Sequence, residues 1–211
     1  MTEPVPRKLN AEDAKTLRVS RRRRQVLQAA AKLMQKSGYH SMSMQALADE
    51  AEISVGLIYQ YFGNKDDVLR AVIVDILEDF REAVPQAMRG VGQDPVARLS
   101  SGMRAFCEIV DSKRDATVLA YRESLTLSTA GRDQIKFLEI QTTEPIRQAV
   151  SDGIDQGTFR PVDPELIVHN LLMIAHGWAL KHWRLATMMS LEDYIRAETA
   201  MLLASINSPR P

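Results

Sequence analysis

The side chains best suited to recognising another molecule are gathered in one short stretch, ISVGLIYQYFGNK, which runs from residue 53 to residue 65. Tyr59 and Tyr61 carry hydroxyl groups that can bond to phosphate oxygens, and the amide of Gln60 can pair with the edge of a base. An apolar residue, Leu57, stands among them. Hydroxyl, amide and apolar groups in this mixture are suited to contacts with the backbone and bases of DNA.

These residues need a short helix to position them, and Ser54 is the residue type that caps one. At 100° per residue the helix divides into a packing side, with Tyr59 at its edge, and an outward side. The packing side holds Val55, Ile58 and Phe62, and the outward side holds Gly56, Leu57, Gln60 and Tyr61. A second short helix over 43–50 precedes it through a tight connector. This arrangement predicts a helix-turn-helix, whose second helix enters the major groove.

Each outward residue has a role in such a groove. Val55 and Leu57 could touch thymine methyl groups, Gly56 lets the backbone come close, and Gln60 or Gln45 could bond to adenine. Hydroxyl groups and a lysine at a helix N-terminus suit phosphates. The residues expected to contact DNA in this region are Ser43, Gln45, Ser54, Val55, Gly56, Leu57, Tyr59, Gln60, Tyr61 and Lys65. The alternative is a plain helical bundle in which the tyrosines only rim a core.

The run MQALADEAEISVGLIYQYFGNKDDVLRAV resembles the DNA-binding signature of the TetR family of bacterial transcriptional regulators. The resemblance covers residues 21–70, and its matching elements are Leu47-Ala48, Ile53-Ser54, Gly56, Ile58-Tyr59, Tyr61-Phe62 and Asn64-Lys65-Asp66. Glu52 departs from the glycine usual before the turn, so the backbone there is expected to differ. The resemblance implies a homodimeric repressor that reads a palindromic operator and is released by a small molecule bound in a C-terminal domain.

Charge is unevenly distributed along the 211 residues. Residues 1–65 hold 11 Lys and Arg against 6 Asp and Glu, whereas residues 66–211 hold 16 against 21. A basic first third indicates an anionic partner for that part, unless two domains differ in charge by chance. We expect the cluster Arg21, Arg22, Arg23 and Arg24 to contact phosphates or a minor groove. The alternative is a solubilising tail.

Apolar periodicity predicts an all-α protein of about nine helices in three regions: a flexible basic arm (1–19), a helix-turn-helix domain (20–65) and a ligand-binding and dimerisation domain (66–211). The first four helices begin at Ser20, Ser43, Ser54 and Asn64, and the fourth should end at about Val84, before a loop that starts with Pro85. The remaining helices are expected over 95–112, 114–129, 133–156, 163–188 and 191–206, with a kink or break at Pro145.

The segment 163–188 is apolar on two faces, which predicts a helix buried on two sides, one of them in a partner subunit. Which face meets the partner is open, and a monomer with a central buried helix is the alternative. With the helix over 191–206 it would form a four-helix dimer interface, as TetR-like proteins use. Its expected residues are Leu171, Ile174, Trp178, His182, Leu185, Tyr194, Ile195, Met201 and Leu202.

A ligand pocket is expected among the helices of the second domain. Its expected lining is Met103, Phe106, Cys107, Tyr121, Arg122, Leu125, Phe137, Gln141, Met173 and His176, a mostly apolar set that suits an elongated apolar ligand. Arg122 could meet a carboxylate, thioester or phosphate, or pair with Glu139. The tracts YRESLTL and GTFRPVDPELIVHNLLMIAHGWALKHW resemble a TetR subgroup that senses fatty acids or acyl-CoA thioesters. The alternative is a constitutive dimeric DNA-binding protein without small-molecule control.

Other classes of function have little support in the sequence. His169 and His176 lie two helical turns apart, too far to share a metal ion without a bridging residue, and no catalytic triad or phosphate-binding loop is evident. No cofactor, metal or enzymatic activity is therefore expected. Cys107 is the single cysteine, expected to be a packed thiol, and no apolar run is long enough to span a membrane. A cytoplasmic location is expected.

Overall fold

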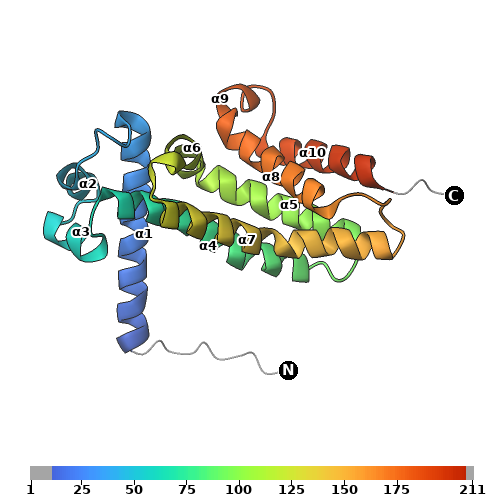
Figure 1. The fold of residues 1–211 in the computed structure, drawn as a ribbon, viewed down its shortest axis with the longest axis horizontal. Coiled ribbons are helices and arrows are strands. Elements are labelled where there is room, and N and C mark those ends of the chain that lie inside the picture. Colours follow the sequence, from blue (N-terminus) through green and yellow to red (C-terminus); the bar gives the residue numbers. More distant parts are fainter. Residues whose placement is uncertain (1–10, 208–211) are drawn as a thin grey trace. The chain divides into compact units, whose positions relative to one another are not determined.

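A computed structural model describes residues 11–207 of the chain, and the side chains from residue 18 onward. Within those residues it contains ten α-helices, nine of them of seven or more residues, one 3₁₀-helix and no strand, so the all-α prediction is confirmed (Figure 1). Phe159 and Asn207 form an isolated bridge. The chain divides into two compact units that meet between Leu69 and Arg70, four residues later than the expected boundary.

The first unit contains α1 (Ala11–Ser37), α2 (Met44–Glu50), α3 (Val55–Tyr61) and the start of α4 (Lys65–Arg89). The expectation of a flexible arm over 1–19 is wrong for residues 11–19, which belong to α1, and residues 1–10 lie outside the described part. The core of this unit is formed by fully buried apolar side chains of the first three helices, Val26, Ala30, Met34, Leu47, Ala48 and Ile58.

Caps begin the short helices where the sequence predicts them. The Ser43 hydroxyl accepts a hydrogen bond from the Ala46 amide at 3.0 Å, and the Ser54 hydroxyl accepts one from the Leu57 amide at 3.3 Å. The Asn64 side chain accepts one from the amide of Asp67 at 3.0 Å. Each cap satisfies an amide that the helix itself leaves without a partner.

Helix α4 continues through Pro85 to Arg89, so the predicted end at Val84 is wrong. Proline removes one backbone hydrogen bond, but the helix also has an apolar stripe to bury. Val84 and Met88 are 0% and 3% exposed on either side of the proline. Burial of that stripe therefore outweighs the cost of Pro85.

The second unit consists of the rest of α4 and the helices that follow. These are α5 (Pro95–Ser112), α6 (Arg114–Glu123), the 3₁₀-helix η1 (Ser124–Thr126), α7 (Thr129–Asp155), α8 (Pro164–Leu180), α9 (His182–Leu185) and α10 (Leu191–Ile206). Helix α5 is central and contacts α7, α8 and α10 (Figure 1). Its buried residues include Leu99, Met103, Phe106 and Val110.

The helix bounds of this unit differ from prediction in three places. The helix expected over 114–129 ends at Glu123, and α7 begins at Thr129 rather than 133. Helix α7 is unbroken at Pro145, one turn after the hydroxyl groups of Thr142 and Thr143 bond to backbone carbonyls of their own helix. The helix expected over 163–188 ends at Leu180, because Lys181 leaves the helical conformation and α9 starts anew.

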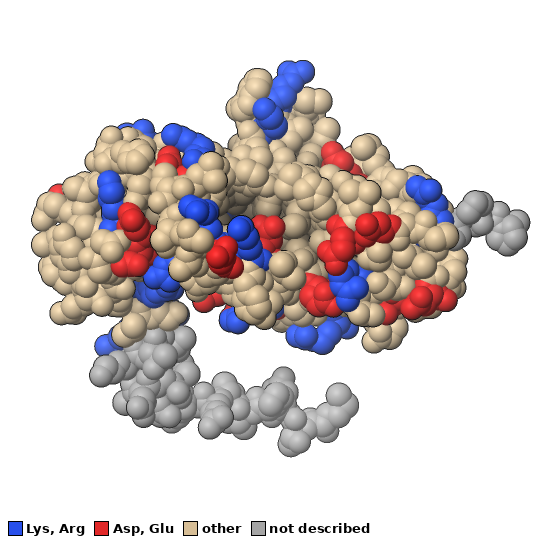
Figure 2. Space-filling model, in the orientation of Figure 1, with Lys and Arg blue, Asp and Glu red and all other residues tan. Residues whose placement is uncertain are grey.

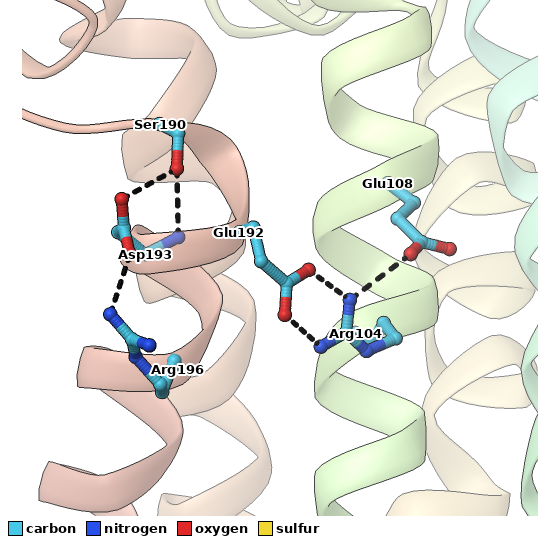
Figure 3. A network of polar contacts seen from close by, with 6 residues as sticks. All are labelled: Arg104, Glu108, Ser190, Glu192, Asp193 and Arg196. Carbon is cyan, nitrogen blue, oxygen red and sulfur yellow. Dashed lines mark hydrogen bonds and ion pairs between the residues drawn. The ribbon is translucent and has the colours of Figure 1, made fainter.

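An ion-pair network fixes the start of α10 on α5 (Figure 3). Arg104 donates to both carboxylate oxygens of Glu192, at 2.5 and 2.7 Å, and also lies 3.5 Å from Glu108. The hydroxyl of Ser190 accepts from the amide of Asp193 at 3.1 Å and caps the helix. Because the paired side chains are substantially exposed, solvent screens the network, which adds little stability and mainly sets the position of α10.

Candidate nucleic-acid interface and pocket

The outward side of α3 is partly open to solvent, with Gly56 and Gln60 exposed and Leu57 and Tyr61 half-buried. Ile58 and Phe62 are buried, at 0% and 4% exposure, whereas Tyr59 is 55% exposed. Six of the ten residues expected to contact DNA here are exposed: Ser43, Gln45, Ser54, Gly56, Tyr59 and Gln60. The other four are half-buried: Val55, Leu57, Tyr61 and Lys65. The structure therefore collects these residues on α2, α3 and the start of α4.

Lys65 is held at the N-terminus of α4 by a residue that the sequence reasoning did not single out. Its ammonium group donates to the His40 carbonyl at 3.1 Å and lies 4.8 Å from the centre of the Tyr39 ring. The hydroxyl of Tyr39 bonds to the Asp66 carboxylate. The sequence does hold a signal for this contact, because Tyr39 is an aromatic residue directly after Gly38, the glycine that ends α1. A lysine fixed beside a helix N-terminus offers an anion two favourable charges.

The turn between α2 and α3 places Glu52 at φ 53°, the one non-glycine residue in the described part of the chain with a positive φ. An L-residue with a side chain pays about 1–2 kcal/mol for this left-handed conformation. The backbone here was expected to differ because Glu52 stands where the family usually has glycine. The difference is a strained left-handed conformation at Glu52. The connector keeps the left-handed turn and carries the strain.

The arginine cluster of α1 is close to the ends of α2 and α3. The guanidinium of Arg23 lies 5.9 Å from the centre of the Phe62 ring, which caps α3, and Gln25 donates to the carbonyl of Ala51, the cap of α2. Arg21, Arg22 and Arg24 are exposed. On the face drawn in Figure 2, Lys and Arg are interspersed with Asp and Glu. The positive charge on that face therefore lies in small groups of Lys and Arg rather than in one broad basic patch.

A cavity of about 330 Å³ lies in the second unit. Its apolar wall comes from one stripe of α4, formed by Ile73, Ile76, Leu77 and Phe80, with Ala120 and Ile135 from α6 and α7. Its polar lining consists of Thr117, Tyr121, Ser124, Glu139 and His176. The structure thus builds a mostly apolar cavity with a few polar groups, which is the usual make-up of a small-molecule site.

A hydrogen bond between Tyr121 and His176 organises the polar side of this cavity. Their Oη and Nδ1 atoms are 2.9 Å apart. Burial lowers the pKa of His176 to about 4, so its ring is neutral at pH 7. Burial also raises the pKa of Glu139 and that of Tyr121. The cavity therefore holds a neutral imidazole beside one carboxyl group.

The lining contains two of the ten residues expected there, Tyr121 and His176. Met103, Phe106 and Cys107 are fully buried in the core of α5, where burial raises the pKa of the thiol to about 12. The other five are exposed and outside the lining: Arg122, Leu125, Phe137, Gln141 and Met173. Within the described residues Arg122 forms no ion pair with Glu139. The α4 stripe was missed because its spacing is also that of an ordinary core stripe.

Most of the expected dimer residues are already covered by their own chain. Leu171, Trp178, Tyr194, Ile195 and Leu202 are each 6% exposed or less, so they leave little surface for a partner, and their contact with one stays a prediction. Trp178 donates to Asp111 of α5 at 2.7 Å, and Tyr194 of α10 donates to the carbonyl of Ile174 at 2.7 Å. Ile174, His182 and Leu185 are half-buried, and Met201 is 64% exposed. The exposed apolar residues of α8 and α9 are instead Leu166, Met173 and Trp183.

The described part of the chain offers neither a metal site nor a membrane span. Residues 18–207, whose side chains the structure describes, contain no group of three or more His, Cys, Asp or Glu side chains placed to hold a metal ion. In the same residues, no helix combines the length and hydropathy that crossing a membrane requires.

Comparison with known proteins agrees with this architecture. The model of the family described as bacterial regulatory proteins, tetR family, matches residues 26–72, and that of the Tetracyclin repressor-like C-terminal domain matches residues 92–204. The HTH-type transcriptional regulator HbdR of Aromatoleum sp. (strain CIB) is 38% identical over 185 residues, which are 88% of this chain and 80% of that protein.

Solved structures give the same result. The TetR family regulator PfmR from Thermus thermophilus superposes with a TM-score of 0.75 at 27% identity, covering 88% of this chain and 99% of PfmR. AibR, solved in complex with isovaleryl coenzyme A and operator DNA, superposes with a TM-score of 0.73 at 26% identity, covering 86% of this chain and 98% of AibR. The chain belongs to the TetR family of transcriptional regulators and carries the family's DNA-binding helix-turn-helix.

Proposed function

We propose that this regulator is a homodimeric repressor that binds a palindromic operator in the cytoplasm and is released by a small, largely apolar effector. The observation that carries this proposal is the continuity of α4. The helix begins with Lys65 at the helix-turn-helix, and its residues Ile73 to Phe80 line the cavity. A molecule that fills the cavity presses on the same helix that starts at the DNA-binding surface.

In this proposal α3 reads bases and its neighbours hold phosphates. Gly56, Leu57 and Gln60 lie on the outward side of α3, and Tyr59 and Lys65 would bond to phosphate oxygens. TetR regulators bind operator DNA as dimers. Two α3 helices would then occupy major grooves about one turn of DNA apart.

The partner subunit is assigned to the exposed side of α8 and α10. This side carries Leu166 and Met173 on α8, and Ala197, Met201 and Ala204 on α10. Met201→Lys should shift the protein toward monomer in light scattering, because a charge would be buried against the partner. Leu125→Lys, at an 82% exposed position outside these helices, is the control. A dimer unaffected by Met201→Lys would refute this assignment.

The effector is proposed to be acyl-bearing. The apolar wall of the cavity suits an acyl chain, and the complex of AibR with isovaleryl coenzyme A shows that a structurally similar regulator accepts an acyl thioester. Coupling of about 1–3 kcal/mol between effector and operator would weaken DNA binding roughly 5- to 150-fold. The alternative, a constitutive DNA-binding dimer, predicts that no acyl compound changes operator affinity.

The test is selection of binding sites from random duplex DNA by the purified protein. One palindrome should be recovered. Gln60→Ala should relax the preference at one base pair per half-site, because removing a bidentate hydrogen bond takes away about 1–3 kcal/mol of discrimination. Gln28→Ala, at an exposed position on α1, should leave the base preference unchanged. Recovery of unspecific DNA alone would refute the regulator proposed here.

The arginine cluster is proposed to supply phosphate contacts outside the reading helix. Replacing Arg21, Arg22 and Arg24 by Gln should reduce the slope of log affinity against log salt by about 0.9 for each phosphate that is no longer neutralised. Lys136→Gln, an exposed charge on α7, should leave the slope unchanged. An unchanged slope in the arginine variant would assign the cluster to solubility.

A further inference from the structure

We propose that the cavity selects an effector whose enclosed polar group is uncharged, such as an amide, alcohol or thioester, and that Glu139 excludes a free carboxylate. This inference rests on the proposed effector role of the cavity. It separates two ligand classes of equal chain length, the fatty acid and its neutral acyl derivative.

The charges in the lining carry the first part of the argument. Its eleven residues include one carboxyl group, Glu139, and no lysine or arginine. A carboxylate that entered would therefore meet the charged form of Glu139 with no lysine or arginine in the lining to offset it. His169, an exposed residue that acts electrostatically on Glu139, lies outside the lining. Like charges placed close together in a partly buried site disfavour each other strongly.

Two cations on or beside the helices that line the cavity are bound elsewhere. Lys113, between α5 and α6, contacts Asp75 at 2.5 Å and Asp79 at 2.6 Å. Arg132 of α7 donates to the backbone carbonyls of Leu125 and Leu127, at 3.2 and 2.6 Å. These cations are held by other partners and do not line the cavity.

The polar groups that remain suit a neutral ligand. A phenol is a stronger donor than acceptor, and Nδ1 of His176 is a better acceptor than the Met173 sulfur, which lies 4.0 Å from the Tyr121 hydroxyl. Tyr121 is therefore assigned as the donor to Nδ1, which places the proton of the neutral ring on Nε2. The ring lines the cavity, so this N–H can donate to a carbonyl or hydroxyl oxygen of the ligand.

Glu139 completes the recognition of such a group. Its carboxyl oxygens can accept a hydrogen bond from an amide N–H or an alcohol O–H, while the same oxygens repel a carboxylate. An acyl thioester has the neutral carbonyl that His176 requires and lacks the charge that Glu139 disfavours. The thioester is thus accepted because its head group is neutral, and the free acid is rejected because its head group is charged.

The experiment compares straight-chain carboxylates with primary amides of the same length, from butyric to octanoic, by calorimetric titration at neutral pH. The wild-type protein should bind each amide at least about tenfold more tightly than its carboxylate. Glu139→Gln should close this gap to about threefold by improving carboxylate binding, since the repelling charge is gone. Asp155→Asn makes the same change of charge on α7 outside the lining and should keep the wild-type ratio.

Three results would overturn the inference: carboxylates that bind as tightly as amides, a ratio unchanged by Glu139→Gln, or amides that do not bind at all. The effector role is tested separately by adding a bound amide to the protein–operator complex. A preserved head-group preference without any change in operator affinity would support the selective cavity and refute the effector role.

Discussion

Glycines in the two units serve opposite purposes. A Cβ atom added at Gly56 of α3 would meet no other atom within 4 Å, whereas one added at Gly153 of α7 would lie 2.2 Å from the Phe159 ring. The first glycine leaves room outside the protein, where a DNA backbone or base can approach. The second leaves room inside, where a buried aromatic ring fills the space. Under the proposed DNA contact, the same residue type keeps a surface open for a partner in one unit and makes room for packing in the other.

Polar side chains show the same contrast. Tyr59 and Gln60 of the first unit are exposed. In the second unit the hydroxyl groups of Thr117 and Thr142 are buried and bonded to carbonyls of the chain, at 3.1 and 2.8 Å. Exposed groups keep their hydrogen-bonding capacity for a partner, and buried groups use it within the chain. Substitutions in the first unit should change DNA affinity, and those in the second should change stability.

The largest effect is expected for Gly153→Ala. Phe159 is 1% exposed, and its amide bonds to the Gly153 carbonyl at 2.9 Å, so the ring cannot move away without breaking that turn. Overpacking of this kind should lower the free energy of unfolding by about 3 kcal/mol, measured by denaturant titration.

Gly102→Ala is the matched control within the same unit. Its Cβ would lie 2.1 Å from Cδ1 of Ile146, the far end of a flexible side chain that can turn away. Its cost should be smaller, about 1 kcal/mol. Equal losses for both variants would contradict the view that the Phe159 ring is held rigidly.

A smaller effect is expected from the buried imidazole of His176. Its pKa is lowered from 6.5 to about 4, so between these values the unfolded chain takes up a proton that the folded chain does not. This stability is complete above pH 6.5 and falls by about 2–3 kcal/mol as the pH drops toward 4.

Unfolding titrations across this pH range should show a weaker acid dependence for His176→Gln than for the wild type. His169→Gln, at an exposed histidine of the same helix, is the control. Parallel pH profiles for His176→Gln and the wild type would show that the ring is not buried neutral.

The two units also differ in how much of them the sequence predicts. Ser43 and Ser54 act on amides within three residues, so local reasoning placed α2 and α3 correctly. In the second unit the apolar face of α8 that includes Leu171 and Trp178 looked equally suited to a partner or to its own core. Only tertiary packing distinguishes the two, and it assigns that face to the core of its own chain. Pro85 shows the same limit, since burial elsewhere on the helix overrode the local rule.

In the first unit, Gly56→Ala should separate folding from binding. With no atom near the added methyl group, the free energy of unfolding should stay the same or rise by up to about 1 kcal/mol, because alanine favours the helix. Operator binding should weaken by about 1–2 kcal/mol, the size of one disturbed base contact. Anisotropy titrations with the selected operator measure the second quantity, and thermal melts measure the first. Unchanged operator affinity would remove Gly56 from the DNA-facing surface.

The smallest expected effect is a gain, from Glu52→Gly in the turn of the same unit. At φ 53° glycine avoids a strain of about 1–2 kcal/mol but loses more entropy on folding, so the net gain in stability should be about 1 kcal/mol or less. Glu52→Ala removes the same charge and keeps the strain, so the difference between the two variants in denaturant titrations isolates the backbone. If Glu52→Gly were no more stable than Glu52→Ala, the backbone at residue 52 would have to leave the left-handed conformation once the glutamate is removed. The contacts of the Glu52 side chain, rather than the turn itself, would then impose that conformation. A clear advantage would show that the first unit carries backbone strain in the connector between the two helices of the helix-turn-helix, directly before α3.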